Sequence, residues 1–183
     1  MAASERDDEG AWLVLAYRIP REPTRLRATV WRRIKSLGAV YLQNSVAALP
    51  DSAANERALR SLRREVLELG GAAQLMRCHL LAGAKDVAAL YNGTRDEEYT
   101  EIIDKCRDFL TEIDNETAAA HFTYAELEEN DEDLAKLRSW FEKVSARDTL
   151  GAAQRDEAND ALSACAAALE EFATRVYHAE DRD

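Results

Sequence analysis

The feature that most constrains the fold is an unbroken apolar run near the start of the chain. Residues 12–17 read Trp-Leu-Val-Leu-Ala-Tyr, and Pro20 and Pro23 follow closely. Such a run is typical of a strand buried on both faces, because a half-buried strand alternates apolar and polar residues. A chain that contains this strand must build a sheet around it and cover the sheet with other elements.

The residues after this strand predict alternating helices and strands. Amphipathic spacing indicates helices, and short apolar runs between turn residues indicate strands. The expected elements are a helix from Thr24 as N-cap to Gly38, a hairpin over 40–49 with its turn at 43–44, a helix over 55–69 and a strand over 73–81. The resulting order, strand-helix-strand-strand-helix-strand, predicts an α+β, ferredoxin-like βαββαβ domain over residues 11–84.

The second half of the chain predicts helices without strands. A turn at Asn92-Gly93 should precede a helix capped by Thr94, and a second capping box at Thr123 should open a further helix. A break is expected near residues 149–151. We therefore expect an all-helical extension with a long αα-hairpin over residues 85–179, and disordered ends at 1–10 and 180–183.

The net charge of −11 is distributed unevenly. Residues 1–85 hold 14 Lys and Arg against 9 Asp and Glu, whereas residues 86–183 hold 10 against 26. A cationic first half suits an anionic partner, and the acidic second half is either solvated or covers the first. The chain has no apolar stretch of membrane-spanning length, and its start is acidic where a secretory signal is basic. We expect a cytoplasmic protein.

Arginine gathers on the two amphipathic helices of the first half and just before them. A guanidinium group can bind phosphate through two parallel hydrogen bonds. The residues expected to contact DNA phosphates are Arg18, Arg21, Arg25, Arg32, Arg33, Lys35, Arg57, Arg60 and Arg64. Arg18, Arg21 and Arg25 lie near a helix start and also form a candidate site for an oxyanion such as chromate. The alternative is that these arginines only solubilise the helices or pair with the acidic half.

Residue types that usually carry catalysis or bind metals form no recognisable motif. The three cysteines and three histidines are spread along the chain at Cys78, Cys106, Cys165, His79, His121 and His178. The acidic cluster over 126–133 lacks the glycine and the ligand spacing of a calcium loop. Cys78 and His79 are adjacent, but neighbouring strand residues point to opposite faces and do not share a site. We expect no catalytic residue, metal or cofactor.

Six stretches of the chain resemble, in order, the N-terminal domain of the bacterial chromate-resistance regulator ChrB. They are Trp12 to Pro23 (WLVLAYRIPREP), Val30 to Gly38 (VWRRIKSLG), Glu68 to Gly71, Thr94 to Tyr99 (TRDEEY), Tyr124 to Asp133 (YAELEENDED) and Ala146 to Gly151 (ARDTLG). The resemblance implies a cytoplasmic regulator of chromate-resistance genes. In that family this domain is joined to a separate C-terminal domain, which these 183 residues do not contain.

Residues 12–50 are also similar, more weakly, to the ferredoxin-like CRISPR adaptation nuclease and to the C-terminal module of PaaX-type repressors. In the nuclease family an aspartate at the end of the first strand helps to hold a divalent metal between two subunits. The matching residue here is Arg18. Because a guanidinium cannot ligate a cation, this resemblance implies a binding module in which the nuclease site is absent.

Together these patterns predict a chromate-resistance-type transcriptional regulator domain that binds DNA as a homodimer, through an arginine-rich helical face and without turnover. Chromate or another oxyanion is a candidate effector. Two other classes stay open. One is a protein-interaction module that partners a separate ChrB C-terminal domain. The other is an enzyme, either a degenerate metal nuclease or a chromate-handling reductase.

Overall fold

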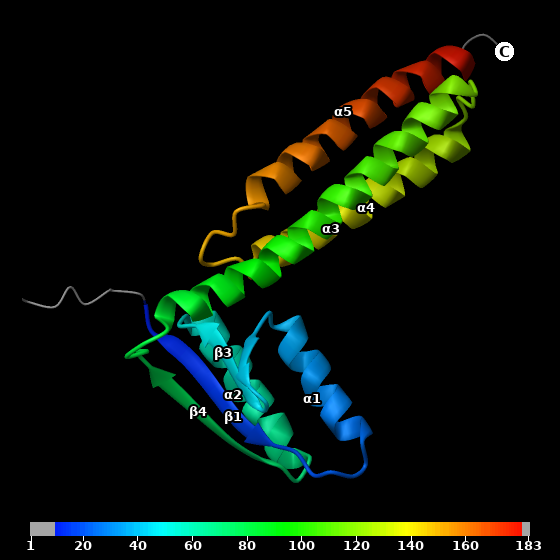
Figure 1. The fold of residues 1–183 in the computed structure, drawn as a ribbon. Helices are drawn as coiled ribbons and strands as arrows, with labels where there is room; N and C mark the ends of the chain where they lie inside the picture. Colours follow the sequence, from blue (N-terminus) through cyan, green and yellow to red (C-terminus); the bar gives the residue numbers. More distant parts are fainter. Residues whose placement is uncertain (1–9, 181–183) are drawn as a thin grey trace, which may run out of the picture. The chain divides into compact units, whose positions relative to one another are not determined.

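The chain forms two compact units, Met1–Tyr91 and Asn92–Asp183. A computed structural model describes residues 10–180 (Figure 1). The expected disordered ends at 1–10 and 180–183 therefore lie outside the described residues, apart from residues 10 and 180. The division between the units falls inside a helix, whereas the sequence placed the domain boundary after residue 84.

The first unit is an α+β structure with a four-stranded antiparallel sheet in its described part. Its elements are β1 (Trp12–Arg18), α1 (Arg25–Ser36), β2 (Val40–Gln43), β3 (Val46–Pro50), α2 (Ala53–Glu68) and β4 (Ala72–Cys78). The strands lie side by side in the order β2-β3-β1-β4. β2 and β4 are therefore the edge strands, and α2 packs against β1 and β4.

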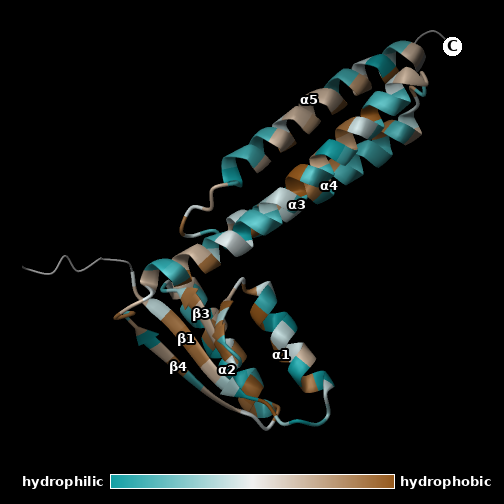
Figure 2. Cartoon of the chain, in the orientation of Figure 1, coloured by the Kyte–Doolittle hydropathy of each residue, from teal (hydrophilic) through white to brown (hydrophobic). Residues whose placement is uncertain are grey.

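The apolar run forms a central strand, as predicted. Leu13 pairs with Leu49 of β3 on one side and with Arg77 of β4 on the other. Trp12, Leu13, Val14 and Leu15 are buried, and hydrophobic residues are concentrated along β1 and β3 (Figure 2). Because both edges of β1 carry strand partners, nearly all of its backbone hydrogen bonds are made inside the sheet.

Residues with strong local preferences mark where most helices and strands of this unit begin and end, and some of these positions differ from the prediction. The Ser52 hydroxyl accepts a hydrogen bond from the Asn55 amide at 3.1 Å, so α2 begins at Ala53, two residues earlier than expected. Thr24 precedes α1, but its side chain makes no capping hydrogen bond. The hairpin turn lies at residues 44–45, one position later than expected, and β4 ends at Cys78 because its partner β1 begins at Trp12.

The second unit consists of helices that run from α3 (Ala84–Ala118) through α4 (Tyr124–Ser145) to α5 (Arg155–Glu180). α4 and α5 pack together, and the Thr123 hydroxyl accepts a hydrogen bond from the Glu126 amide at the start of α4. The core between the helices includes Ile102, Cys106, Cys165 and Phe172. Among the described residues, no helix is both long enough and apolar enough to cross a bilayer.

The predicted turn at Asn92-Gly93 and helix start at Thr94 are wrong, because α3 passes through all three positions. Tyr91 and Arg95 stand one helical turn apart on either side of the turn sequence, and each is about 1% exposed. Burial of these two large side chains outweighs the local preference of Asn-Gly for a turn. The contacts of α3 thus decide its conformation at this point.

We expect opposite effects on stability from two glycine-to-alanine substitutions. A Cβ at Gly71 would overlap the backbone oxygens of Arg18 and Val66, whereas a Cβ at Gly93, inside α3, would meet nothing within 4 Å. Gly71→Ala should lower the free energy of unfolding by about 2 kcal/mol. Gly93→Ala should raise it by up to about 1 kcal/mol, because alanine favours the helix. Urea denaturation followed by circular dichroism measures both, and a Gly71→Ala protein as stable as the parent would contradict the predicted overlap with the backbone oxygens.

Candidate nucleic-acid interface

All nine cationic residues predicted to contact phosphate are exposed on the first unit. Arg18 ends β1, and Arg21 lies in the segment between β1 and α1. The other seven project from the solvent side of two helices: Arg25, Arg32, Arg33 and Lys35 from α1, and Arg57, Arg60 and Arg64 from α2. The apolar side of each helix turns inward, with Val30 and Ile34 of α1 buried. The amphipathic pattern therefore produces the basic faces that it predicts.

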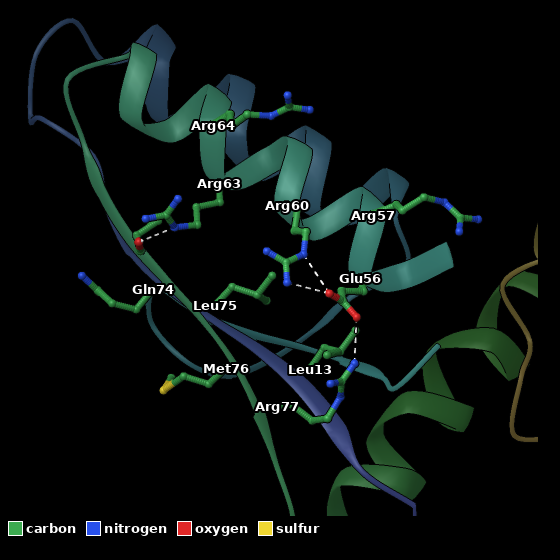
Figure 3. A pocket seen from close by; sticks show the side chains of 11 residues that line it. Leu13, Glu56, Arg57, Arg60, Arg63, Arg64, Gln74, Leu75, Met76 and Arg77 are labelled. Carbon is green, nitrogen blue, oxygen red and sulfur yellow. Dashed lines mark hydrogen bonds and ion pairs between the residues drawn. The ribbon is translucent and has the colours of Figure 1, made fainter. Parts of the chain in front are cut away.

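An open groove of about 990 Å³ lies between α2 and β4, and we call it the α2–β4 groove. Four of its lining residues are arginines of α2 and one is an arginine of β4: Arg57, Arg60, Arg63, Arg64 and Arg77. Leu13, Leu75 and Met76 supply apolar surface. Figure 3 shows Arg57 and Arg64 extending away from the strand, whereas Arg63 reaches towards it and donates to the Ala73 carbonyl oxygen at 3.1 Å.

Glu56 holds two of these arginines in the groove. Its carboxylate accepts a hydrogen bond from Arg60 at 2.7 Å and another from Arg77 at 2.7 Å (Figure 3). Asp51 accepts a third hydrogen bond, from Nε of Arg77, also at 2.7 Å. The hydrogen bond from Arg60 and its positive charge are the main reasons that the pKa of Glu56 is lowered. The hydrogen bond from Arg77 to Asp51 and the charge of Asp51 raise the pKa of Arg77.

A second cavity, of about 650 Å³, lies where β1 ends, and we call it the β1-end hollow. Residues from β1, α1 and the β2–β3 hairpin line it: Tyr17, Arg18, Ile19, Arg21, Arg27, Trp31, Tyr41, Asn44 and Ser45. Arg27 donates a hydrogen bond to the Arg21 carbonyl oxygen at 3.2 Å. The Tyr17 and Tyr41 hydroxyls lie 3.0 Å apart, and burial together with this hydrogen bond raises the pKa of Tyr41.

The two cavities differ in how far their cations are neutralised. Glu56 lines the α2–β4 groove, and Asp51 also pairs with Arg77 there. Among the described residues, no Asp or Glu lines the β1-end hollow. Within the described part of the first unit, Arg60 is the one predicted arginine of eight that forms an ion pair with a carboxylate. The other seven form none: Arg18, Arg21, Arg25, Arg32, Arg33, Arg57 and Arg64. Their charge is therefore not neutralised within their own unit.

The structure brings the predicted residues together only in part. Arg57, Arg60 and Arg64 share the groove, and Arg18 and Arg21 share the hollow. Arg25, the third member of the predicted oxyanion site, does not line the hollow, and Arg27 takes part instead. Three further predicted residues, Arg32, Arg33 and Lys35, line neither cavity.

Sequence reasoning missed Arg77 and the three aromatic residues of the hollow. Strand alternation gives a signal for Arg77, because it shares a face of β4 with Leu75, which lines the groove. Tyr17, Trp31 and Tyr41 come from a strand, a helix and a second strand. Their meeting depends on how those elements pack, so no local pattern indicates it.

The cysteines and histidines line neither cavity. Cys78 is the last residue of β4 and His79 lies beyond it, so the two are not neighbours within one strand. Cys106 and Cys165 are buried in the second unit, and burial raises the pKa of each thiol. His121 and His178 are exposed. Within residues 10–180, no group of three or more Asp, Glu, His or Cys side chains is arranged to hold a metal ion.

Two of the motif stretches in the second half contact each other. Tyr99 donates a hydrogen bond to Asp148 at 3.2 Å, and Arg147 donates one to Glu98 at 3.2 Å. Asp148 also accepts hydrogen bonds from the backbone amides of residues 151 and 152, just before α5. These stretches, 94–99 and 146–151, therefore join α3 to the connection between α4 and α5.

Comparisons with known proteins agree with the resemblance seen in the sequence. The family model described as protein ChrB, N-terminal, matches residues 27–183. No curated protein and no solved structure matches the chain. The matched region begins inside α1, so β1 and the segment with Arg18 and Arg21 precede it. Because the match covers far more than half of the 183 residues, the chain belongs to the family of ChrB N-terminal domains.

Proposed function

We propose that this chain is a regulatory domain of the chromate-resistance type that binds DNA through the arginines of its first unit, without turnover. Membership of the ChrB N-terminal family supports the regulatory context. The observation that carries DNA binding is the set of exposed arginines without a carboxylate partner in the described part of their own unit, which includes Arg57 and Arg64. Such a guanidinium binds phosphate without first breaking an ion pair.

The proposal includes a ferredoxin-like fold for the first unit and a homodimer located in the cytoplasm. The strand order β2-β3-β1-β4, antiparallel throughout, supports the fold, because two interleaved β-α-β units produce this order. A homodimer would present two copies of the arginine surface to one DNA duplex. An oxyanion effector would use the same cations as the phosphate group of a larger anion, Arg18 and Arg21, with Arg27 in place of Arg25.

Binding of this kind draws its free energy from the release of counterions. Each phosphate that an arginine neutralises releases condensed cations, so affinity falls as the salt concentration rises. The contacts position the duplex and carry no sequence information by themselves. In the α2–β4 groove, Arg57 and Arg64 are the residues best placed for this role, because they extend outward and make no ion pair with a described residue of their unit.

We expect the double variant Arg57→Gln with Arg64→Gln to weaken binding to duplex DNA and to flatten its salt dependence. A plot of log affinity against log salt should have a slope near −0.9 per contacted phosphate. Loss of two contacts should then reduce the magnitude of the slope by about 1.8. Fluorescence anisotropy with a labelled duplex at four salt concentrations measures both quantities.

The matched control removes the same charge from the second unit. Arg138→Gln with Arg175→Gln changes two exposed arginines of α4 and α5 and should leave the slope unchanged. An equal reduction in both double variants would mean that overall charge alone drives binding. A parent protein whose affinity does not vary with salt would remove the proposal.

Glu56→Gln should have the opposite effect and strengthen DNA binding. The substitution removes the negative charge that binds Arg60 and Arg77. It frees the Arg60 guanidinium for phosphate, whereas Arg77 keeps its ion pair with Asp51. We expect affinity for duplex DNA to rise roughly threefold near 0.1 M salt, from the loss of one repulsive charge close to the phosphates. Glu68→Gln, at the exposed end of α2, is the control and should change affinity little. Weaker binding by Glu56→Gln, with unchanged circular dichroism, would contradict the role given to the groove.

A further inference from the structure

The β1-end hollow combines two kinds of chemistry that duplex binding does not require together. Arg18, Arg21 and Arg27 provide positive charge, and no Asp or Glu is among its described lining residues. Three aromatic side chains, Tyr17, Trp31 and Tyr41, provide flat apolar surface beside these cations. The α2–β4 groove has the arginines but no aromatic lining residue. The hollow is therefore chemically distinct from the groove.

Several of its groups are already held in place. The two tyrosine hydroxyls are hydrogen-bonded to each other at 3.0 Å, and Arg27 is anchored on the Arg21 carbonyl oxygen at 3.2 Å. Trp31 lies one helical turn after Arg27 on α1, and its side chain is 51% exposed. An exposed indole at a helix surface beside cationic groups is a suitable platform for stacking a planar ring.

The size of the hollow helps to select its ligand. A volume of about 650 Å³ lies within the range of 300–1,000 Å³ that is usual for sites of small organic ligands. A single tetrahedral oxyanion would contact the arginines but leave the aromatic surface unused. An uncharged ring would stack but leave the arginines without a partner. A ligand that uses both sets of groups has a planar ring and an anionic group a few ångströms away.

We propose that the β1-end hollow binds a nucleotide unit, with its base stacked on Trp31 and its phosphate on Arg18 and Arg21. Asn44 and Ser45 lie at the same cavity and supply hydrogen-bonding groups for the edge of a base. The nucleotide can be free in solution or can be an unpaired residue of single-stranded DNA, since both present the same chemistry. This inference does not depend on duplex binding by the α2–β4 groove.

The test is calorimetric titration of the full chain with four probes: 5′-dAMP, deoxyadenosine, inorganic phosphate and a single-stranded (dA)₁₀. We expect 5′-dAMP to bind saturably and at least tenfold more tightly than deoxyadenosine or phosphate. If (dA)₁₀ binds at least tenfold more tightly than 5′-dAMP, the natural source of the nucleotide is a single strand. If it does not, the source is the free nucleotide. Saturation by phosphate as tight as by 5′-dAMP, or no binding of 5′-dAMP, would overturn the proposal.

Variants separate the two halves of the site. Trp31→Ala should weaken 5′-dAMP binding about tenfold through loss of stacking, and Trp31→Phe should recover most of it. Arg21→Gln should weaken 5′-dAMP and leave deoxyadenosine unchanged. Arg175→Gln, an exposed arginine of α5 that lines neither cavity, is the matched control and should leave 5′-dAMP binding unchanged. Equal binding by the parent and Trp31→Ala proteins would also overturn the proposal.

The outcomes for the hollow and for the proposed function can be told apart. Binding of 5′-dAMP without a salt-dependent affinity for duplex DNA would support the nucleotide site in the hollow and contradict the proposed function. Binding of duplex DNA through Arg57 and Arg64 without binding of 5′-dAMP would support the proposed function and contradict the nucleotide site in the hollow.

Discussion

The pairing of β1 on both of its edges is the constraint on which the first unit depends. β3 and β4 fix the register of this strand, and the register decides which residues lie at its end. Ala16 pairs with Val46, the first residue of β3, so the next residues of β1 lie beside the β2–β3 turn. Tyr17 and Arg18 therefore line the β1-end hollow together with that turn. A shift of one residue would turn Leu13 and Leu15 to the opposite face of the sheet. The core and the candidate site therefore require the same register.

The α2–β4 groove shows how carboxylates limit a cationic surface. Glu56 lies in the first turn of α2, where a negative charge is favoured by the helix dipole. From that position it also binds Arg77, 21 residues later in the chain, and holds it together with Arg60. Arg57 and Arg64, which extend outward, have no carboxylate partner in the described part of the unit, and Arg63 donates to a backbone carbonyl oxygen instead. The number of arginines alone therefore overstates the charge available for phosphate.

The sequence predicts the succession of elements in the first unit because residues with strong local preferences mark their ends. Gly38 and Gly70 have positive φ at the ends of α1 and α2, and Ser52 caps α2. The second unit is predicted less well at its start, where burial of Tyr91 and Arg95 keeps Asn92-Gly93 helical. Local preference gives the elements, and tertiary burial changes the result where the two disagree.

The two candidate sites also differ in how far local sequence patterns predict them. Helical spacing places Arg57, Arg60 and Arg64 on one side of α2, so the basic face of the groove is accessible to sequence reasoning. The β1-end hollow is not, because Trp31 and Tyr41 come to line one cavity only through the packing of α1 and β2 in the folded unit. No local pattern predicts the pairing of Glu56 with Arg77 across the groove either, because the two residues are 21 positions apart in the chain.

The linked hydroxyls of Tyr17 and Tyr41 limit how acidity can influence the hollow. Burial and the shared hydrogen bond raise the pKa of Tyr41, so this phenol stays neutral in mildly alkaline solution. Guanidinium groups do not release a proton in folded proteins, and no described histidine or carboxylate lines the cavity. Tyr41 therefore adds no negative charge to the cavity when the solution becomes weakly basic, and the phosphate proposed there would meet no phenolate at this position.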